Sequence, residues 1–226
     1  MPISYEDFKW REVQPGTWRR GVDEAESFYH HLMRCYEGSG RKYFAITGHI
    51  TLTIEETGEG GLNDVASRMD AALRSAWLQL RLDCPTVASQ IIYDTAAKSL
   101  NKQYKVLGTS ESHEAWLQQT FQRVSNGQTG VEWCNSDPPA PDLATLFVIV
   151  PPSENGTSGV RRDVVLRAPH DIIDGMGTLH LLNSLVVNAA AAYANPSAIN
   201  VGGGEEPIHS VESDVEAAKN CIGTLS

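Results

Sequence analysis

The stretch VLRAPHDIIDGMGTLHLL, residues 165–182, decides how this sequence is interpreted. It begins inside an apolar run that predicts a strand over residues 163–168. It ends in apolar residues at helical spacing, which predict a helix over residues 174–194. Between the two lies the segment His170-Asp171-Ile172-Ile173-Asp174-Gly175. Junctions between strands and helices are where α/β folds expose functional side chains, so the sequence predicts a functional histidine at this turn.

His170 is the candidate catalytic residue, because an imidazole can accept a proton from a hydroxyl or amine near neutral pH. Asp174 lies where the helix begins, a position that favours a carboxylate. We expect Asp174 to hold the turn through an arginine rather than to act as a second base. Gly175 is expected to leave room for a close approach by substrate or backbone. The nearest arginines in sequence are Arg161, Arg162 and Arg167.

The remaining elements are predicted from periodicity, capping residues and chain breakers. The first twenty residues are expected to be irregular. Asp23, with Glu26 three residues later, predicts the start of a helix that Gly38 ends. A second helix is expected from Asn63 to Pro85, and a third over residues 111–124. Further strands are expected over residues 43–55, 86–93, 104–107 and 146–150.

This order of elements predicts one α+β domain over residues 1–195, followed by a flexible linker or tail over residues 196–226. The composition changes after residue 196, where a glycine run opens a polar, acidic segment with few large apolar residues. The length of 226 residues is enough for one domain of ordinary size.

Composition and charge exclude some partners. A net charge of −10 argues against nucleic acid or an anionic membrane surface as the main partner. No apolar run approaches the ~18 residues of a membrane span, and the N-terminus does not read as a secretory signal. The four cysteines are scattered, so we expect reduced thiols in a cytoplasmic protein. The other histidines lack ligand-spaced partners, so no metal site is expected.

A family resemblance rests on three stretches of the chain: AALRSAWLQLRLDCP at residues 71–85, LFVIVPP at residues 146–152, and the motif region at residues 165–182. They resemble the HxxxDG acyltransferase superfamily, which includes chloramphenicol acetyltransferase, the condensation domains of peptide synthetases and the BAHD acyltransferases. The strongest resemblance is to the N-terminal half of fungal trichothecene O-acetyltransferase-like proteins. It implies an α+β two-layer sandwich of the chloramphenicol acetyltransferase type, with helices packed on a mixed sheet.

The resemblance also implies an activity. His170 would be the general base that deprotonates a hydroxyl of a small secondary metabolite, and the acyl donor would be an acyl-CoA, acetyl-CoA above all. Asp174 and Gly175 would be structural, and neither a metal nor a covalent acyl-enzyme is implied. The acceptor would be a small molecule, with no nucleic acid or membrane partner.

The sequence departs from the family in two respects. Pseudo-dimeric members have two such domains with the active-site channel between them, whereas this chain has the length of one. Pro169 also stands where condensation domains have a second histidine. The partner completing the channel would be a second copy of the chain or a complementary second half. The alternative hypothesis is an inactive or repurposed half-domain that binds a small molecule or a partner chain, or a fragment of a longer protein.

Overall fold

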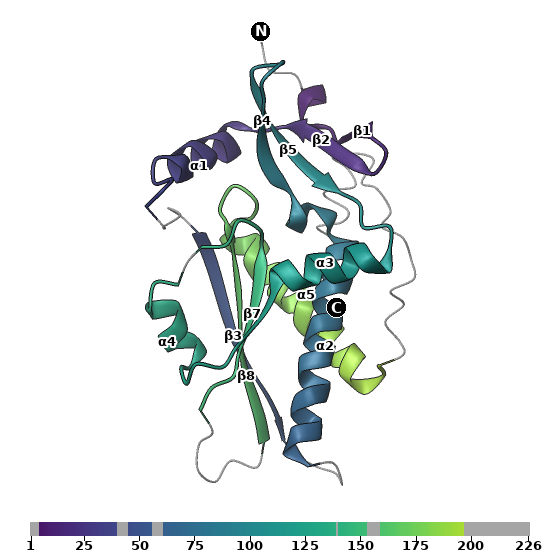
Figure 1. Ribbon diagram of the computed structural model, residues 1–226, viewed down its shortest axis with the longest axis vertical. Coiled ribbons are helices and arrows are strands. Elements are labelled where there is room, and N and C mark those ends of the chain that lie inside the picture. Colours follow the sequence, from purple (N-terminus) through teal and green to yellow (C-terminus); the bar gives the residue numbers. More distant parts are fainter. Residues whose placement is uncertain (1–4, 40–44, 56–60, 139, 153–158, 197–226) are drawn as a thin grey trace.

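Two four-stranded sheets organise the part of the chain that the computed structural model describes, which is residues 5–39, 45–55, 61–138, 140–152 and 159–196. The larger sheet has the order β3-β8-β7-β6, formed by Ala45–Glu55, Gly159–Pro169, Thr145–Ile149 and Phe121–Val124. The smaller sheet has the order β1-β2-β5-β4, formed by Arg11–Gln14, Thr17–Gly21, Ser99–Lys105 and Gln90–Asp94. Figure 1 shows the smaller sheet at one end of the molecule, above the larger one.

Strand β8 is the centre of the larger sheet. It pairs antiparallel with β3 along eleven residues, from Ala45 opposite Pro169 to Glu55 opposite Gly159. On its other side it pairs antiparallel with β7, which in turn pairs parallel with β6. Side chains are buried on both faces of β8, because the consecutive residues Val164, Val165 and Leu166 are all buried. The strand ends at Pro169, so His170 is the first residue beyond this rigid element.

Two long helices cover one face of the larger sheet, α2 (Leu62–Asp83) and α5 (Gly175–Ala194). Figure 1 shows them crossing the sheet together, with α3 (Ser110–Thr120) beside them and the short α4 (Gly130–Asn135) on the opposite side. Gly48 on β3 allows α5 to approach closely, since a Cβ atom there would lie 2.6 Å from Thr178 and 2.7 Å from Leu182. The main core is formed by α2, α3, α5 and the strands beneath them.

The smaller sheet has a core of its own, made by Trp10, Trp18 and Tyr104. Helix α1 (Glu24–Arg34) follows β2, and short 3₁₀ turns occupy η1 (Tyr5–Phe8) and η2 (Pro85–Ala88). No residue of α1 is buried, although its capping box of Asp23 and Glu26 is fully formed. Helix α1 therefore owes little of its position to apolar packing.

The predicted α+β fold with helices on a mixed sheet is confirmed, as are the helices at α1, α2 and α5 and the strands at β3, β7 and β8. Four local predictions are wrong. The first twenty residues contain a hairpin, β1 and β2, whose turn needs the positive φ of Gly16. The predicted helix over residues 111–124 ends at Thr120, and the segment after it becomes β6. Residues 86–93 divide into η2 and β4. The short strand expected over residues 104–107 is the end of the longer β5.

Other expectations meet the structure in part. Cys84 is disulfide-bonded, so the expectation of four reduced thiols is wrong for this residue, while Cys35 and Cys134 are free. The tail was predicted over residues 196–226. Residues 197–226 of it, which include Cys221, lie outside the described residues. In the described part of the chain, no helix combines the length and the apolar character needed to cross a membrane.

Candidate functional site

His170 opens the turn between β8 and α5. The turn is closed by a hydrogen bond of 3.1 Å from the amide of Ile172 to the carbonyl of Pro169. The imidazole is half-buried and stacks on the phenol ring of Tyr29 from α1, with ring centroids 3.9 Å apart and planes inclined by 7°. Because β8 fixes its backbone and Tyr29 covers one ring face, His170 has a restricted orientation.

Asp171, which follows His170, is buried and contacts His30, which follows Tyr29 in α1. Its Oδ2 lies 3.2 Å from Nδ1 of His30, with the carboxylate only 5% exposed. Two consecutive residues of α1, Tyr29 and His30, thus contact the consecutive residues His170 and Asp171. Helix α1 is attached to the turn by these side-chain contacts.

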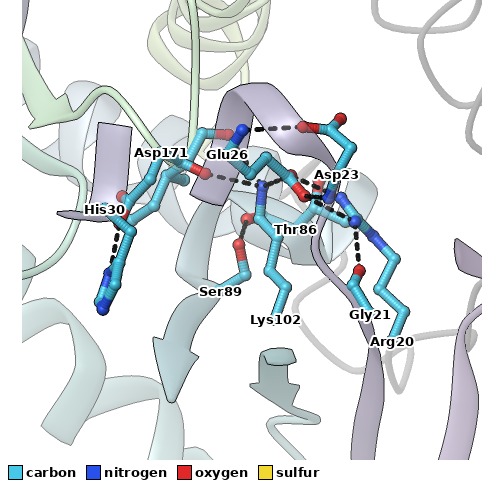
Figure 2. Close-up of polar contacts among 10 residues, drawn as sticks. Arg20, Gly21, Asp23, Glu26, His30, Thr86, Ser89, Lys102 and Asp171 are labelled. Atoms are coloured by element: carbon cyan, nitrogen blue, oxygen red, sulfur yellow. Dashed lines mark hydrogen bonds and ion pairs between the residues drawn. The ribbon is translucent and has the colours of Figure 1, made fainter. Parts of the chain in front are cut away.

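Lys102 of β5 reaches the same turn from the smaller sheet. Its ammonium donates hydrogen bonds to the backbone carbonyls of Asp171 at 3.1 Å and Ile172 at 3.4 Å. It also donates to Oε1 of Glu26 on α1 at 2.7 Å. Figure 2 shows Lys102 between Glu26 and Asp171, with His30 on the far side of Asp171. Strand β5 and helix α1 therefore both meet the turn at the residues that follow His170.

Glu26 completes this cluster by pairing with Arg20 of β2, whose guanidinium donates to both carboxylate oxygens at 2.7 and 2.8 Å. Burial alone would raise the pKa of Glu26, but hydrogen bonds and positive charge from Arg20 and Lys102 outweigh it and lower the pKa to about 2. Burial lowers the pKa of Lys102. The negative charges of Glu26 and Asp171 oppose this decrease in the pKa, whereas the positive charge of Arg20 adds to it. Each charge in the cluster is thus paired rather than isolated.

Asp174 does not pair with an arginine, contrary to expectation. Among the described residues no basic side chain forms an ion pair with it; instead it caps α5, accepting a hydrogen bond of 2.7 Å from the amide of Gly177. A carboxylate at this position satisfies one of the free amides of the first helical turn. The three candidate arginines bind elsewhere, with Arg161 on Asp163, Arg162 on Asp70 and Arg167 on Thr47.

Gly175 begins α5 in open space. A Cβ atom at this position would meet no heavy atom within 4 Å, so nothing in the described part of the chain itself requires a glycine there. The expectation that Gly175 allows a close approach by substrate stays a prediction. The space lies one residue beyond the capping carboxylate of Asp174.

Two other features are separate from this turn. An apolar cavity of about 300 Å³ lies between β3, α2 and α5, lined among others by Leu52, Met69 and Tyr193. It is at the end of β3 opposite to Ala45, the residue paired with Pro169, and so is remote from His170. Within the described ranges, no three His, Cys, Asp or Glu side chains are grouped so as to hold a metal ion.

No protein-family model matches the chain. Curated relatives include the acetyltransferase pigO of Monascus ruber, 26% identical over 204 residues that cover 90% of this chain and 39% of the relative. The O-acetyltransferase pigM of the same organism is 30% identical over 191 residues, covering 83% of this chain and 33% of the relative. The chain therefore spans between a third and two fifths of the length of these relatives.

Among solved structures, TRI3 trichothecene 15-O-acetyltransferase from Fusarium sporotrichioides superposes with a TM-score of 0.64 at 14% identity, over 87% of this chain and 40% of that one. The starter condensation domain of rhizomide synthetase RzmA gives a TM-score of 0.50 at 16% identity, over 92% and 44% of the two chains. The chain therefore has the fold shared by these acetyltransferase and condensation-domain structures, and its sequence is similar to those of two acetyltransferases. The relatives and the fold thus agree with the resemblance seen in the motif region.

Sequence reasoning located His170 within this acyltransferase fold but missed the residues around it. The sequence predicts Tyr29 and His30 as ordinary members of an amphipathic helix, and it places Lys102 outside every predicted strand. Their contacts with residues 170–172 join segments about 70 and 140 positions apart, as the separations of the bonded pairs show. The one local signal was the capping box at Asp23 and Glu26, which positions α1.

The capping role of Asp174 predicts a distinct pattern of stability. Asp174→Ala should lower the free energy of unfolding by ~1 kcal/mol, whereas Asp174→Asn should cost less because asparagine is an equally good cap. Urea unfolding followed by circular dichroism measures both. A loss with Asp174→Asn as large as with Asp174→Ala would contradict the capping role and restore the idea of a charge partner.

The pKa of Glu26 predicts how stability depends on pH. A carboxylate whose folded pKa is depressed contributes stability above its unfolded pKa of 4.5 and loses it as pH falls toward the folded value of about 2. The difference corresponds to ~3 kcal/mol. The destabilisation caused by Glu26→Gln should therefore be largest at pH 5 to 7 and shrink by roughly that amount on acidification to pH 2.

Chemical unfolding of Glu26→Gln and wild type between pH 7 and 2 measures this difference. Glu24→Gln is the matched control, since Glu24 is an exposed carboxylate on the same helix. If the wild type and Glu26→Gln lose stability in parallel over the whole range, the buried cluster does not hold the Glu26 carboxylate as described.

Proposed function

We propose that this chain takes part in transfer of an acyl group from an acyl-CoA, such as acetyl-CoA, to a hydroxyl of a small secondary metabolite, with His170 as the general base. The observation that carries the proposal is the position of His170, which is held at the end of β8 and stacked on Tyr29 in a fold whose relatives are acetyltransferases. The open space at Gly175 supports it, because a substrate can approach the start of α5 there.

The reaction needs two proton transfers, one to the imidazole and one from it, and one exchange at a carbonyl carbon. His170 takes the proton of the acceptor hydroxyl while the oxygen attacks the thioester carbonyl, forming a C–O bond. The tetrahedral intermediate then collapses with cleavage of the C–S bond. The imidazolium returns its proton to the departing thiolate, so the products are an ester and free CoA thiol. The base is regenerated in each cycle, and no acyl-enzyme is needed.

The substrate class follows from relatives rather than from geometry. The pigO and pigM proteins are named acetyltransferases, pigM an O-acetyltransferase, and TRI3 is named a trichothecene 15-O-acetyltransferase. These names support an acetyl donor and an alcohol acceptor on a small fungal metabolite. The pairing of a rigid histidine with an open helix start is compatible with this chemistry.

Removal of the base gives the direct test. His170→Ala should reduce the release of CoA thiol from acetyl-CoA, in the presence of a panel of polyketide and sesquiterpenoid alcohols, by ~10²–10⁴-fold with an unchanged fold. Thiol release is measured with a chromogenic thiol reagent, and the fold by circular dichroism. His31→Ala is the matched control, because His31 is an exposed histidine on α1. Full activity of His170→Ala would exclude His170 as the base.

The alternative is a half-domain that binds a small molecule or partner without catalysis. Calorimetric titration of the purified 226-residue chain with acetyl-CoA separates the two. Binding with no alcohol-dependent thiol release favours a repurposed binding domain. If acetyl-CoA neither binds nor is consumed with any alcohol in the panel, the acyltransferase proposal is wrong for this chain.

The exposed outer face of α5 supports the hypothesis that a partner chain binds to this helix. This helix has no charged residue in its 20 positions, a composition usual for helices buried on all sides. Yet Met176, Leu179 and Val187 are each at least 60% exposed. They lie on the helix that begins at the motif, so a chain packed against them would also enclose the region beside His170. We infer that a second copy of this chain covers the face.

A charge on this face should therefore prevent association. Leu179→Glu should shift the protein from dimer to monomer in size-exclusion chromatography with light scattering at tens of micromolar. Val131→Asp is the control, since Val131 is 54% exposed on α4, across the sheet from α5. A wild-type protein that is monomeric at high micromolar concentration would rule out self-association through α5. It would leave a different, complementary chain as the partner.

A further inference from the structure

Lys102 contacts the backbone of the motif, and its side-chain hydrogen-bond partner among the described residues is Glu26, which lies outside the motif on α1. We infer that Lys102 is a positioning residue for His170, fixing the turn from which the imidazole projects; the inference rests on the proposed role of His170 as the base. Lys102 lies on β5 in the smaller sheet, apart from the strand and helix that carry the motif.

The ammonium of Lys102 has three donor protons and three acceptors. The acceptors are Oε1 of Glu26 and the carbonyl oxygens of Asp171 and Ile172. Lys102 and Asp171 are each only 5% exposed, so water has little access to the ammonium and to the carbonyl of Asp171. Buried carbonyls need donors, and no other donor to these two carbonyl oxygens is seen among the described residues. One buried cation therefore binds two consecutive peptide groups of the turn.

The energetics favour a role beyond stability. The desolvation cost of a buried ion pair cancels much of its electrostatic attraction. A protein in which well-packed apolar residues replace such a pair is therefore often as stable as the original. A methionine at position 102 would fill similar volume, but it could not donate to the carbonyls of residues 171 and 172. What the lysine adds is a fixed geometry for the two peptide groups after His170.

That geometry is transmitted directly to the imidazole. The carbonyl of Asp171 lies one residue from the Cα atom of His170, and the side chain of Asp171 is itself held by His30. The stack of His170 on Tyr29 depends on the same turn, because Tyr29 and Glu26 share helix α1 and Lys102 binds Glu26. Loss of Lys102 would therefore remove one contact that holds the turn and one that holds α1. Displacement of a general base by ~1 Å can cost ~10²-fold in rate.

The test is Lys102→Met in the full-length chain, compared with Lys105→Met. Lys105 lies on the same strand, but its side chain is exposed. In the acetyl-CoA assay with the most active alcohol, Lys102→Met should lower kcat by ~10–100-fold with KM for acetyl-CoA within about twofold. Lys105→Met should match the wild type. A merely structural role would lower the amount of folded enzyme, not kcat per folded molecule.

The double variant Lys102→Met/Glu26→Gln keeps the test valid if the single variant unfolds. It removes the carboxylate that would otherwise be buried without the Lys102 charge, while the amide oxygen introduced by Glu26→Gln can still accept a hydrogen bond from Arg20. The double variant should recover stability relative to Lys102→Met but not kcat, because residues 171 and 172 still lack their donor. Recovery of wild-type kcat in the double variant would overturn the positioning role.

A second measurement does not depend on activity. The C2 proton of His170, identified in the NMR spectrum by its absence in His170→Gln, should carry a ring-current shift from the stacked Tyr29. The shift should diminish in Lys102→Met and in the double variant, but not in Lys105→Met. An unchanged His170 resonance in both Lys102 variants overturns the inference. If the wild type has no activity, the proposed function fails, and the NMR shift alone decides whether Lys102 positions His170.

Discussion

The pairing of β3 with β8 along eleven residues is the interaction on which the rest of the structure depends. It places β8 between two neighbours and buries it on both faces, so its last residue, Pro169, is fixed in space. Everything that follows, the turn at His170 and the helix α5, starts from this point. The helices α2 and α5 then close one face of the sheet, with Gly48 allowing the close contact between β3 and α5.

The turn that begins at His170 is held in a different way from the core. Below it, the sheet and helices are held by buried apolar side chains, whereas around it the contacts are charged, hydrogen-bonded or stacked. Arg20 and Lys102 share the carboxylate of Glu26, so each of these buried charges has a partner of opposite sign. Polar contacts are directional, and they therefore specify the orientation of a turn more closely than apolar packing does. The same contacts hold α1, which has no buried residue of its own.

The sequence predicted the parts of the fold that leave a periodic pattern. Three elements were predicted correctly because the burial of each side chain is reflected in its residue type. They are β3 with its alternation, β7 with its apolar run and α2 with its apolar face. The prediction failed at residues 121–124, because β6 exists only through pairing with β7, and at the N-terminal hairpin, whose burial depends on Tyr104 far along the chain. At the site, His170 was visible from its motif. Tyr29, His30 and Lys102 could not be identified from the sequence, because only contacts between distant segments bring them to the turn.

The topology of the larger sheet also has a consequence for how the chain reaches this structure. Strand β8 must pair with β3, which precedes it by more than a hundred residues, and the parallel pair β6 and β7 needs a crossover through α4. Contacts between such distant segments form slowly, because the loop-closure entropy is lost before the pairing compensates for it. During that interval the apolar residues of β7 and β8 have no cover. The central strands that give the folded molecule its rigidity are thus also segments that expose the nascent chain to aggregation.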